Sequence, residues 1–277
     1  MGVTAIKAAA MSLGIRVCQP ENINTPESLS MLRELKPDLF VIIAYGQIFS
    51  REALDIPMIL SVNSHASLLP AYRGAAPINW ALINGEEKTG VTIMKVTRKM
   101  DSGPVILQRE IPIEDADTVV TVEKKLADMG ADILLEAVTR IENHSYSLCE
   151  QDELKATVAQ KLKKEHGLIY WDNPAGKIHN LVRGVLDWPG AFTHYRGKQL
   201  KIFKTTILPS VQDSSVNTPG EILSVSKNGI VVAAGEGALC VEELQLEGRR
   251  KMSAAEFISG HKIAAGEFFE QIHSDGK

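Results

Sequence analysis

Apolar and polar positions in the first half of the chain predict strands that alternate with helices. Residues 39–44 form a continuous apolar run, which is typical of a strand buried on both faces of a parallel sheet. Apolar residues recur at helical spacing over residues 126–141, as in a helix that packs against a core. We also expect helices at residues 3–13 and 25–35, a strand at residues 15–19 and a hairpin over residues 91–111. This order predicts a doubly wound α/β sheet.

The pattern in the second half of the chain is different and predicts two helices followed by short strands. Helices are predicted at residues 156–166 and 175–183, followed by five strands between residues 191 and 244. Residues 226–229, Ser-Lys-Asn-Gly, form a strong hairpin signal. Strands with this spacing favour a small OB-like barrel. Residues 143–155 are polar and read as the connection, so we expect domains at residues 1–150 and 151–277.

Composition excludes several classes of protein. The chain has 277 residues and a formal net charge of −4, so a basic surface must be local. Its three cysteines are far apart, which predicts neither a zinc site nor a disulfide framework and favours a reducing compartment. No apolar run reaches membrane-spanning length, and the first residues lack the order of a signal peptide. We expect no bound metal and no membrane association.

Three polar residues are candidates for chemistry. Asn63 and His65 lie two residues apart directly after an apolar strand end, so their side chains would face one pocket. Asp101 lies in a turn of small, flexible residues. The alternative is structural: Asn and Asp cap turns, and a single His near a strand end is usually a surface or hydrogen-bonded residue.

The segment from Asn63 to Pro77 resembles the 10-formyltetrahydrofolate-dependent formyltransferases. The sequences Ala44-Tyr45-Gly46 upstream and Met100-Asp101-Ser102-Gly103 downstream belong to the same likeness. Within that family, the motif Ser67-Leu-Leu-Pro-x-x-Arg-Gly-Ala-Ala-Pro77, together with Asp187-Trp-Pro-Gly-Ala-Phe192, is similar to the branch that acts on methionyl-tRNA. The family opens with a strand, a Gly-Thr-Pro loop, a helix, and a second strand with a basic loop. This sequence begins after them, so a partial Rossmann-like domain is expected.

The resemblance implies a fold, a reaction and a site. It implies a Rossmann-like formyltransferase domain, truncated at its N-terminus, followed by an OB-like domain that binds RNA. The formyl donor would be 10-formyltetrahydrofolate and the acceptor initiator methionyl-tRNA, in a bacterial cytoplasm or an organelle matrix. Asn63, His65 and Asp101 would be catalytic. The walls of the folate site would be Tyr45, Gly46, Ser67, Leu68, Leu69 and Pro70.

Charge in the second half is uneven. Residues 155–204 hold ten Lys or Arg against three Asp or Glu, which is a footprint for an RNA backbone, although a solvated face is equally compatible. Arg73 could bind the folate tail or an acceptor phosphate, or pair with an acidic neighbour. The residues expected to contact tRNA are Arg73, Lys161, Lys163, Lys164, Arg183, Lys201 and Lys204.

Two other functions stay open at this point. The same donor could serve another amine, such as that of a nucleotide sugar or of glycinamide ribotide. Alternatively, the chain could be an inactive fragment that binds folate or RNA. The basic barrel argues against the ribotide, and the Trp188-Pro-Gly motif favours tRNA. We expect the protein to be a monomer.

Overall fold

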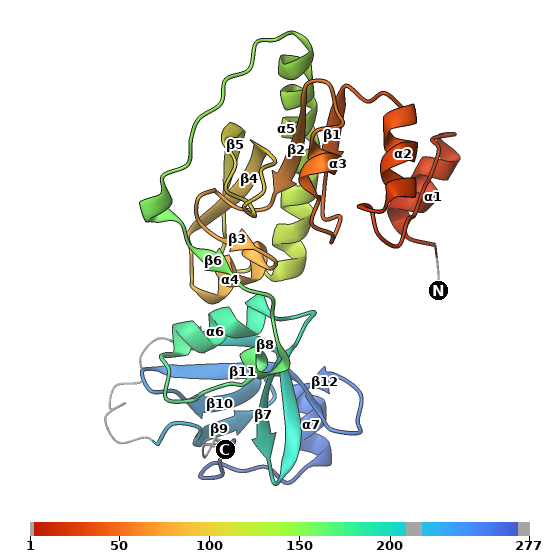
Figure 1. The fold of residues 1–277 in the computed structure, drawn as a ribbon. Helices are drawn as coiled ribbons and strands as arrows, with labels where there is room; N and C mark the ends of the chain where they lie inside the picture. Colours follow the sequence, from red (N-terminus) through yellow and green to blue (C-terminus); the bar gives the residue numbers. More distant parts are fainter. Residues whose placement is uncertain (1–2, 209–217, 271–277) are drawn as a thin grey trace, which may run out of the picture.

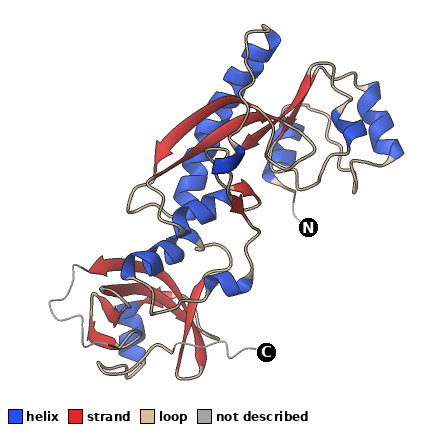
Figure 2. Ribbon diagram, turned by 60° about the vertical axis from the view of Figure 1, so that its left-hand side comes forward, coloured by secondary structure: helices blue, strands red, loops and turns tan. Residues whose placement is uncertain are grey.

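The chain folds around two β-sheets, each with its own hydrophobic core (Figure 1). The structure is a computed structural model that describes residues 3–208 and 218–270. The first sheet lies in the N-terminal half of the chain and the second in the C-terminal half, as Figure 2 shows from another side. None of the helices in these ranges is long and apolar enough to cross a bilayer.

The first sheet has the strand order β1-β2-β4-β5. Strands β1 and β2 are parallel, whereas β4 pairs antiparallel with both β2 and β5. The expected parallel pair and the expected hairpin are therefore both present, with helices on both faces of the sheet. The strands are β1 Leu39–Ile42, β2 Leu60–His65, β4 Lys88–Lys95 and β5 Val105–Pro112, and the helices before and between them are α1 Ala5–Ser12, α2 Pro26–Glu34, α3 Arg51–Leu54 and α4 Pro77–Ile83.

The long helix α5, Val119–Glu142, covers one face of this sheet. It begins with a capping box in which Thr118 and Thr121 exchange hydrogen bonds, an arrangement that satisfies otherwise unpaired backbone donors. Its apolar stripe, which includes Leu126, Ile133 and Ala137, is buried in the first core. Full burial of each large aliphatic side chain stabilises the fold by about 1.5 to 3 kcal/mol. The prediction that this stripe is core packing is confirmed.

The second sheet is antiparallel and has the order β7-β8-β11-β10-β9. Its two edge strands are bridged by residues 268–270: Glu270 pairs with His194 of β7, and Phe268 pairs with Glu221 beside β9. The sheet therefore curves toward closure through this segment, which is compatible with the expected OB-like barrel. The predicted hairpin turn at residues 226–229 joins two paired strands. The elements are β7 Ala191–Tyr195, β8 Lys198–Leu208, β9 Ile222–Ser226, β10 Gly229–Ala233, β11 Ala238–Leu246, β12 Met252–Ser253 and α7 Ala254–Gly260.

Helix α6, Ala175–Gly184, joins the two halves by packing against α4. The amide of Asn79 donates to the carbonyl of Gly184 at 2.8 Å. A Cβ atom at Gly184 would lie 2.8 Å from a side-chain carbon of Ile83, so the close approach of the helices requires glycine. Arg183 donates from the same helix end to the carbonyls of Glu114 and Asp117.

Two predicted elements are wrong. Residues 15–19 were expected as a strand, but they are irregular and largely exposed, and no described strand lies beside them to share a ladder. Residues 156–166 were expected as a helix, but they contain the short strand β6, Val158–Ala159, and a 3-10 turn, Lys164–Gly167. Strand β6 pairs with β3, Arg73–Gly74, and this distant partner overrides the local helical pattern.

Candidate active site

Asn63 and His65 lie at the carboxyl end of β2, on the face that turns away from α5. Val62 belongs to the core beneath α5, and side chains alternate along a strand, so Asn63 and His65 share the opposite face. The side chain of Asn63 makes no hydrogen bond with any described residue. Its amide is therefore available to a ligand, as the sequence predicted for an uncharged donor.

His65 is buried, with 6% of its surface exposed, and held by a backbone carbonyl. Its Nε2 atom lies 2.9 Å from the carbonyl oxygen of Tyr72. A carbonyl only accepts hydrogen bonds, so this contact assigns a proton to Nε2. Its Nδ1 atom faces Asp101, with 3.7 Å between Nδ1 and Oδ2. That gap is too long for a direct hydrogen bond, but the two groups are close enough to interact electrostatically.

Asp101 reaches this site from the loop between β4 and β5. Its backbone has φ 49°, a conformation uncommon for residues other than glycine. Its Oδ2 atom accepts a hydrogen bond from the backbone amide of Gly74 at 2.9 Å, whereas Oδ1 accepts none from the described residues. The structure thus places Asp101 beside His65, as predicted, with one carboxylate oxygen held and the other available for proton transfer.

The loop after β2 is fixed by two polar side chains of the neighbouring hairpin. Thr92 donates to the carbonyl of Ser67 at 2.6 Å and accepts from the amide of Leu69 at 3.2 Å. Gln108 donates to the carbonyl of Leu69 at 3.0 Å and to Thr92 Oγ1 at 2.7 Å. These contacts order the segment expected to form a folate wall, and neither Thr92 nor Gln108 was identified from the sequence.

The expected folate-wall residues differ in exposure. Ser67 and Leu69 are buried, with Leu69 only 5% exposed, so little of the Leu69 side chain is accessible to a ligand. Leu68 and Pro70 are partly exposed. Tyr45 is 41% exposed; it and Gly46 follow β1, whose last residue pairs with Asn63. The loop of Tyr45 and Gly46 therefore starts beside the catalytic candidates.

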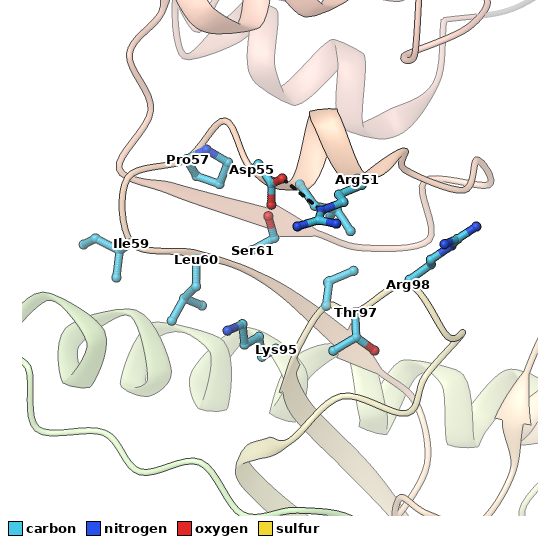
Figure 3. A pocket seen from close by; sticks show the side chains of 11 residues that line it. Arg51, Asp55, Pro57, Ile59, Leu60, Ser61, Lys95, Thr97 and Arg98 are labelled. Carbon is cyan, nitrogen blue, oxygen red and sulfur yellow. Dashed lines mark ion pairs between the residues drawn. The ribbon is translucent and has the colours of Figure 1, made fainter.

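A hollow of about 540 Å³ lies along the same face of the sheet (Figure 3). It is lined by residues of α3, by the start of β2 and by the segment that follows β4, among them Leu54, Ser61, Lys95 and Thr97. Ser61 is 3% exposed, and its Oγ atom has no hydrogen-bond partner. Ser61, Asn63 and His65 occupy alternate positions of one strand, so the hollow continues the row of polar groups. This period-two polar row was the signal that could have identified Ser61.

Some of the residues expected to contact tRNA are bound by other protein groups, and the others are exposed. Arg73 is buried and hydrogen-bonds to the side chains of Gln151 and Glu153, which is the acidic-neighbour alternative. Arg183 is engaged at the contact between domains, and its partial burial lowers the pKa of its guanidinium. Lys204 pairs with Glu242 at 2.7 Å. Lys161, Lys163 and Lys164 are exposed, and Lys201 is partly exposed.

Two further observations concern the surroundings of the site. Partial burial and a hydrogen bond to Glu86 raise the pKa of Tyr72 to about 12, so its hydroxyl stays protonated near neutral pH. Among the described residues, no group of three or more His, Cys, Asp or Glu side chains could hold a metal ion. The site therefore presents an amide donor, an imidazole and a carboxylate, and the hollow lies farther toward the start of β2, where none of these three groups lines it.

Comparison with known proteins assigns both halves of the chain to one family. The family model described as formyl transferase matches residues 3–138, and the model described as formyl transferase, C-terminal domain matches residues 161–262. The methionyl-tRNA formyltransferase of Acetivibrio thermocellus is 45% identical over 266 residues, which cover 96% of this chain and 85% of that protein. The methionyl-tRNA formyltransferase of Trichlorobacter lovleyi is 43% identical over 94% of this chain and 81% of its own.

Solved structures share the fold at lower identity. An N-formyltransferase from Helicobacter canadensis, in complex with folinic acid and dTDP-3-aminofucose, has a TM-score of 0.67 at 20% identity, covering 85% of this chain and 81% of its own. HypX from Aquifex aeolicus, in complex with tetrahydrofolic acid, has a TM-score of 0.63 at 20% identity, covering 84% of this chain and 41% of its own. From its family models and its curated relatives, the chain belongs to the formyltransferase family.

Proposed function

We propose that this protein is an enzyme that transfers a formyl group from 10-formyltetrahydrofolate to the α-amine of initiator methionyl-tRNA. The observation that carries this proposal is the 45% identity, over 96% of the chain, to a methionyl-tRNA formyltransferase. The site is compatible with it, because Asn63 and His65 share one face of β2 and Asp101 lies beside His65. The product would serve the initiation of translation.

The proposed reaction forms a bond from the amine nitrogen to the formyl carbon and breaks the bond from that carbon to the folate nitrogen. When bound, the folate supplies the formyl group and a nitrogen that leaves with a proton. Negative charge develops on the formyl oxygen, and the amide of Asn63 donates to it. A positioned donor of this kind is worth about 3 to 4 kcal/mol.

Proton transfer falls to His65 and Asp101. The attacking α-amine must lose a proton to react, and the free Oδ1 atom of Asp101 can receive it, while Gly74 holds Oδ2. His65 keeps its Nε2 proton on the Tyr72 carbonyl and presents Nδ1 to the carboxylate. We propose that His65 orients the carboxylate of Asp101 through the Nδ1 atom that faces it.

The hollow lined by Ser61, two residues before Asn63 on β2, has a mixed lining that suits the flat ring system of a folate. Its walls combine apolar side chains such as Leu54 with the unpartnered hydroxyl of Ser61, and a pterin needs both stacking and hydrogen bonds. We propose that this hollow receives the pterin. The residues expected from the sequence as folate walls, Tyr45, Gly46, Ser67, Leu68, Leu69 and Pro70, do not line this hollow.

The tRNA side of the proposal depends on exposed cations. Lys161, Lys163 and Lys164 precede α6, close to the junction of the two domains, because Leu162 packs in the second core together with Ala76. We propose that these lysines and Lys201 contact the RNA backbone. Arg73, Arg183 and Lys204 are engaged by protein groups and would contribute less. We further propose that the protein is cytoplasmic and monomeric. Light scattering of the purified protein tests the oligomeric state.

The test is formyl transfer by the purified protein, with methionyl-tRNA and 10-formyltetrahydrofolate as substrates. We expect formylmethionyl-tRNA to form, and no comparable product with an amino nucleotide sugar or with glycinamide ribotide. Preferential formylation of either small amine would replace the proposed acceptor. Binding of folate and tRNA without turnover would instead support the fragment alternative.

A further inference from the structure

Gln151 lies in the connection between the domains, yet its side chain reaches the catalytic loop. Its Nε2 atom donates to the carbonyl of Asp101 at 2.9 Å and to the carbonyl of Gly103 at 2.7 Å. The connection is brought there by Cys149, whose backbone pairs with Val105 at the start of β5. One amide group therefore holds two carbonyls of the loop that carries the catalytic carboxylate.

The other end of the same side chain is held by Arg73. The Oε1 atom of Gln151 accepts from Arg73 Nη2 at 2.7 Å and from Nε at 3.0 Å. The amide of Gln151 cannot adopt the flipped orientation, because its NH₂ group would then face the guanidinium of Arg73, which only donates hydrogen bonds. Arg73 also donates to Glu153, which pairs with Lys99 of the same loop at 2.5 Å. The orientation of Gln151 is thus determined at both ends.

A second contact from this region acts on the Asp101 side chain. Gly74 follows Arg73 and donates its backbone amide to Oδ2 of Asp101. Strand β6 pairs with Arg73 and Gly74, and a Cβ atom at Gly74 would lie 2.5 Å from the carbonyl oxygen of Ala159. The connection therefore braces both the backbone and the carboxylate of Asp101.

We propose that Gln151 is a positioning residue, which holds the 101–103 loop so that the Asp101 carboxylate faces His65 and the acceptor amine. This inference rests on the proposed function for its catalytic consequence and on the hydrogen bonds above for its structural one. The backbone of Asp101 has φ 49°, so a residue other than glycine is kept in an unfavourable conformation by its surroundings. The two donated hydrogen bonds supply that constraint.

Only an amide satisfies both ends of this arrangement. Glutamate at position 151 would keep the contact with Arg73 but would place an acceptor against the two carbonyls. Methionine would keep the length of the side chain and lose both contacts. The variants Gln151→Glu and Gln151→Met therefore separate the loop contact from the Arg73 contact. Glu150→Gln is the matched control, since Glu150 is an exposed neighbour outside the site.

The first experiment measures amide hydrogen exchange of the full chain without substrates. We expect both Gln151 variants to exchange faster than the parent over residues 97–104, with little change in the segment that contains β2. The Glu150→Gln control should match the parent throughout. Unchanged exchange of residues 97–104 in Gln151→Glu and Gln151→Met would overturn the inference, whatever the enzyme proves to formylate.

The second experiment is a double-mutant cycle with Asp101→Asn, using formylation kinetics. A positioning error near 1 Å can reduce turnover about 100-fold, so we expect kcat of Gln151→Met to fall about 10- to 100-fold with KM for methionyl-tRNA within about twofold. In the Asp101→Asn background the same change should cost less than about twofold, because residues that act as one unit are not additive.

The outcomes of the cycle separate three cases. Equal fold losses in both backgrounds would assign Gln151 a role independent of Asp101 and contradict the inference. Parent-like kcat in Gln151→Met would contradict it as well. A parent protein without formyl transfer to methionyl-tRNA would refute the proposed function instead, and the exchange experiment would still decide the structural claim.

Discussion

His65 illustrates how the protein restricts each catalytic candidate to one task. Its Nε2 proton is committed to the carbonyl of Tyr72 at 2.9 Å, so only Nδ1 faces the carboxylate of Asp101. Asn63 is the opposite case, because no described residue uses its amide. A residue without a protein partner on the reactive face of a strand can donate to a charge that appears only during the reaction.

We expect Asn63→Ala and His65→Ala each to reduce kcat strongly, with Asn63→Ala losing about 100- to 1000-fold because one oxyanion donor is removed. The unfolding midpoint should change little for Asn63→Ala, since its side chain has no partner among the described residues. Formylation kinetics and thermal unfolding measure the two quantities. Asn143→Ala, at an exposed site after α5, is the control, and full turnover by Asn63→Ala would exclude its role.

Glu153 gives a pH-dependent prediction at the same scale. Hydrogen bonds from Arg73 and then Lys99 lower the pKa of Glu153 to about 2, compared with about 4.3 in an unfolded chain. Because the folded pKa is the lower one, the stabilisation is complete above the unfolded value and is lost as pH falls through the folded value. The difference in unfolding midpoint between the parent and Glu153→Gln should therefore be constant from pH 7 to about 5.

Below about pH 4 that difference should shrink, and it should vanish near the pKa of about 2. Thermal unfolding of both proteins over this pH range measures it, with Glu150→Gln as a control that shows no such trend. A difference that instead grows as the solution is acidified would contradict the assigned pKa shift.

Among the elements, the short strand pair β3–β6 matters most for the site. It comprises Arg73–Gly74 and Val158–Ala159, two residues on each side. It brings the amide of Gly74 to Asp101 and places Ala159 so close that a side chain at position 74 has no space. Gly74 has φ 124°, a region that side-chain-bearing residues rarely adopt.

Gly74→Ala should therefore lower stability by about 2 to 4 kcal/mol, through backbone strain and overpacking together. It should also reduce formylation, because the donor to Asp101 moves. Denaturant unfolding and kinetics measure these effects. Gly176→Ala in α6 is the matched glycine control, since no atom lies within 4 Å of its added Cβ, and it should stabilise by about 0.5 to 1 kcal/mol. Equal stability of the two variants would refute the account of Gly74.

Elements with a strong local pattern were predictable from the sequence, and elements that depend on distant partners were not. The stripe of α5 and the hairpin turn at residues 226–229 follow from residues close in sequence. Strand β6 forms only because residues 73–74 lie beside it, which no local pattern reveals. For the same reason Asn63 and His65 could be paired by spacing, and the same spacing extends to Ser61, whereas Gln151 required the folded chain.

On the scale of the whole molecule, charge is distributed unevenly around a net value of −4. The exposed lysines 161, 163 and 164 lie between β6 and α6, where the two domains meet. Lys161 and Lys164 have no ion pair with any described residue, and Lys163 Nζ lies 3.7 Å from Glu165 Oε1. A cluster of exposed cations near the junction can attract a polyanion even though the protein as a whole is acidic.

Replacing Lys161, Lys163 and Lys164 with Gln should weaken tRNA binding and make it less sensitive to salt. Each lost phosphate contact reduces the slope of log K against log salt by about 1. Binding titrations at several salt concentrations measure this slope. Lys124→Gln, on the exposed face of α5, is the control that should keep the parent slope. An unchanged slope in the triple variant would remove these lysines from the RNA surface.

The contacts made by Gln151 and β6 determine where the chain can be divided into its two domains. Residues 151–159 follow the border expected at residue 150, but they are bonded to the N-terminal half of the chain. We propose that the boundary between the two domains falls after residue 159. A catalytic half excised at residue 150 would leave the Arg73 guanidinium without its acceptors, so a chimera that grafts this half onto a foreign RNA-recognition module should inherit the chain through Ala159.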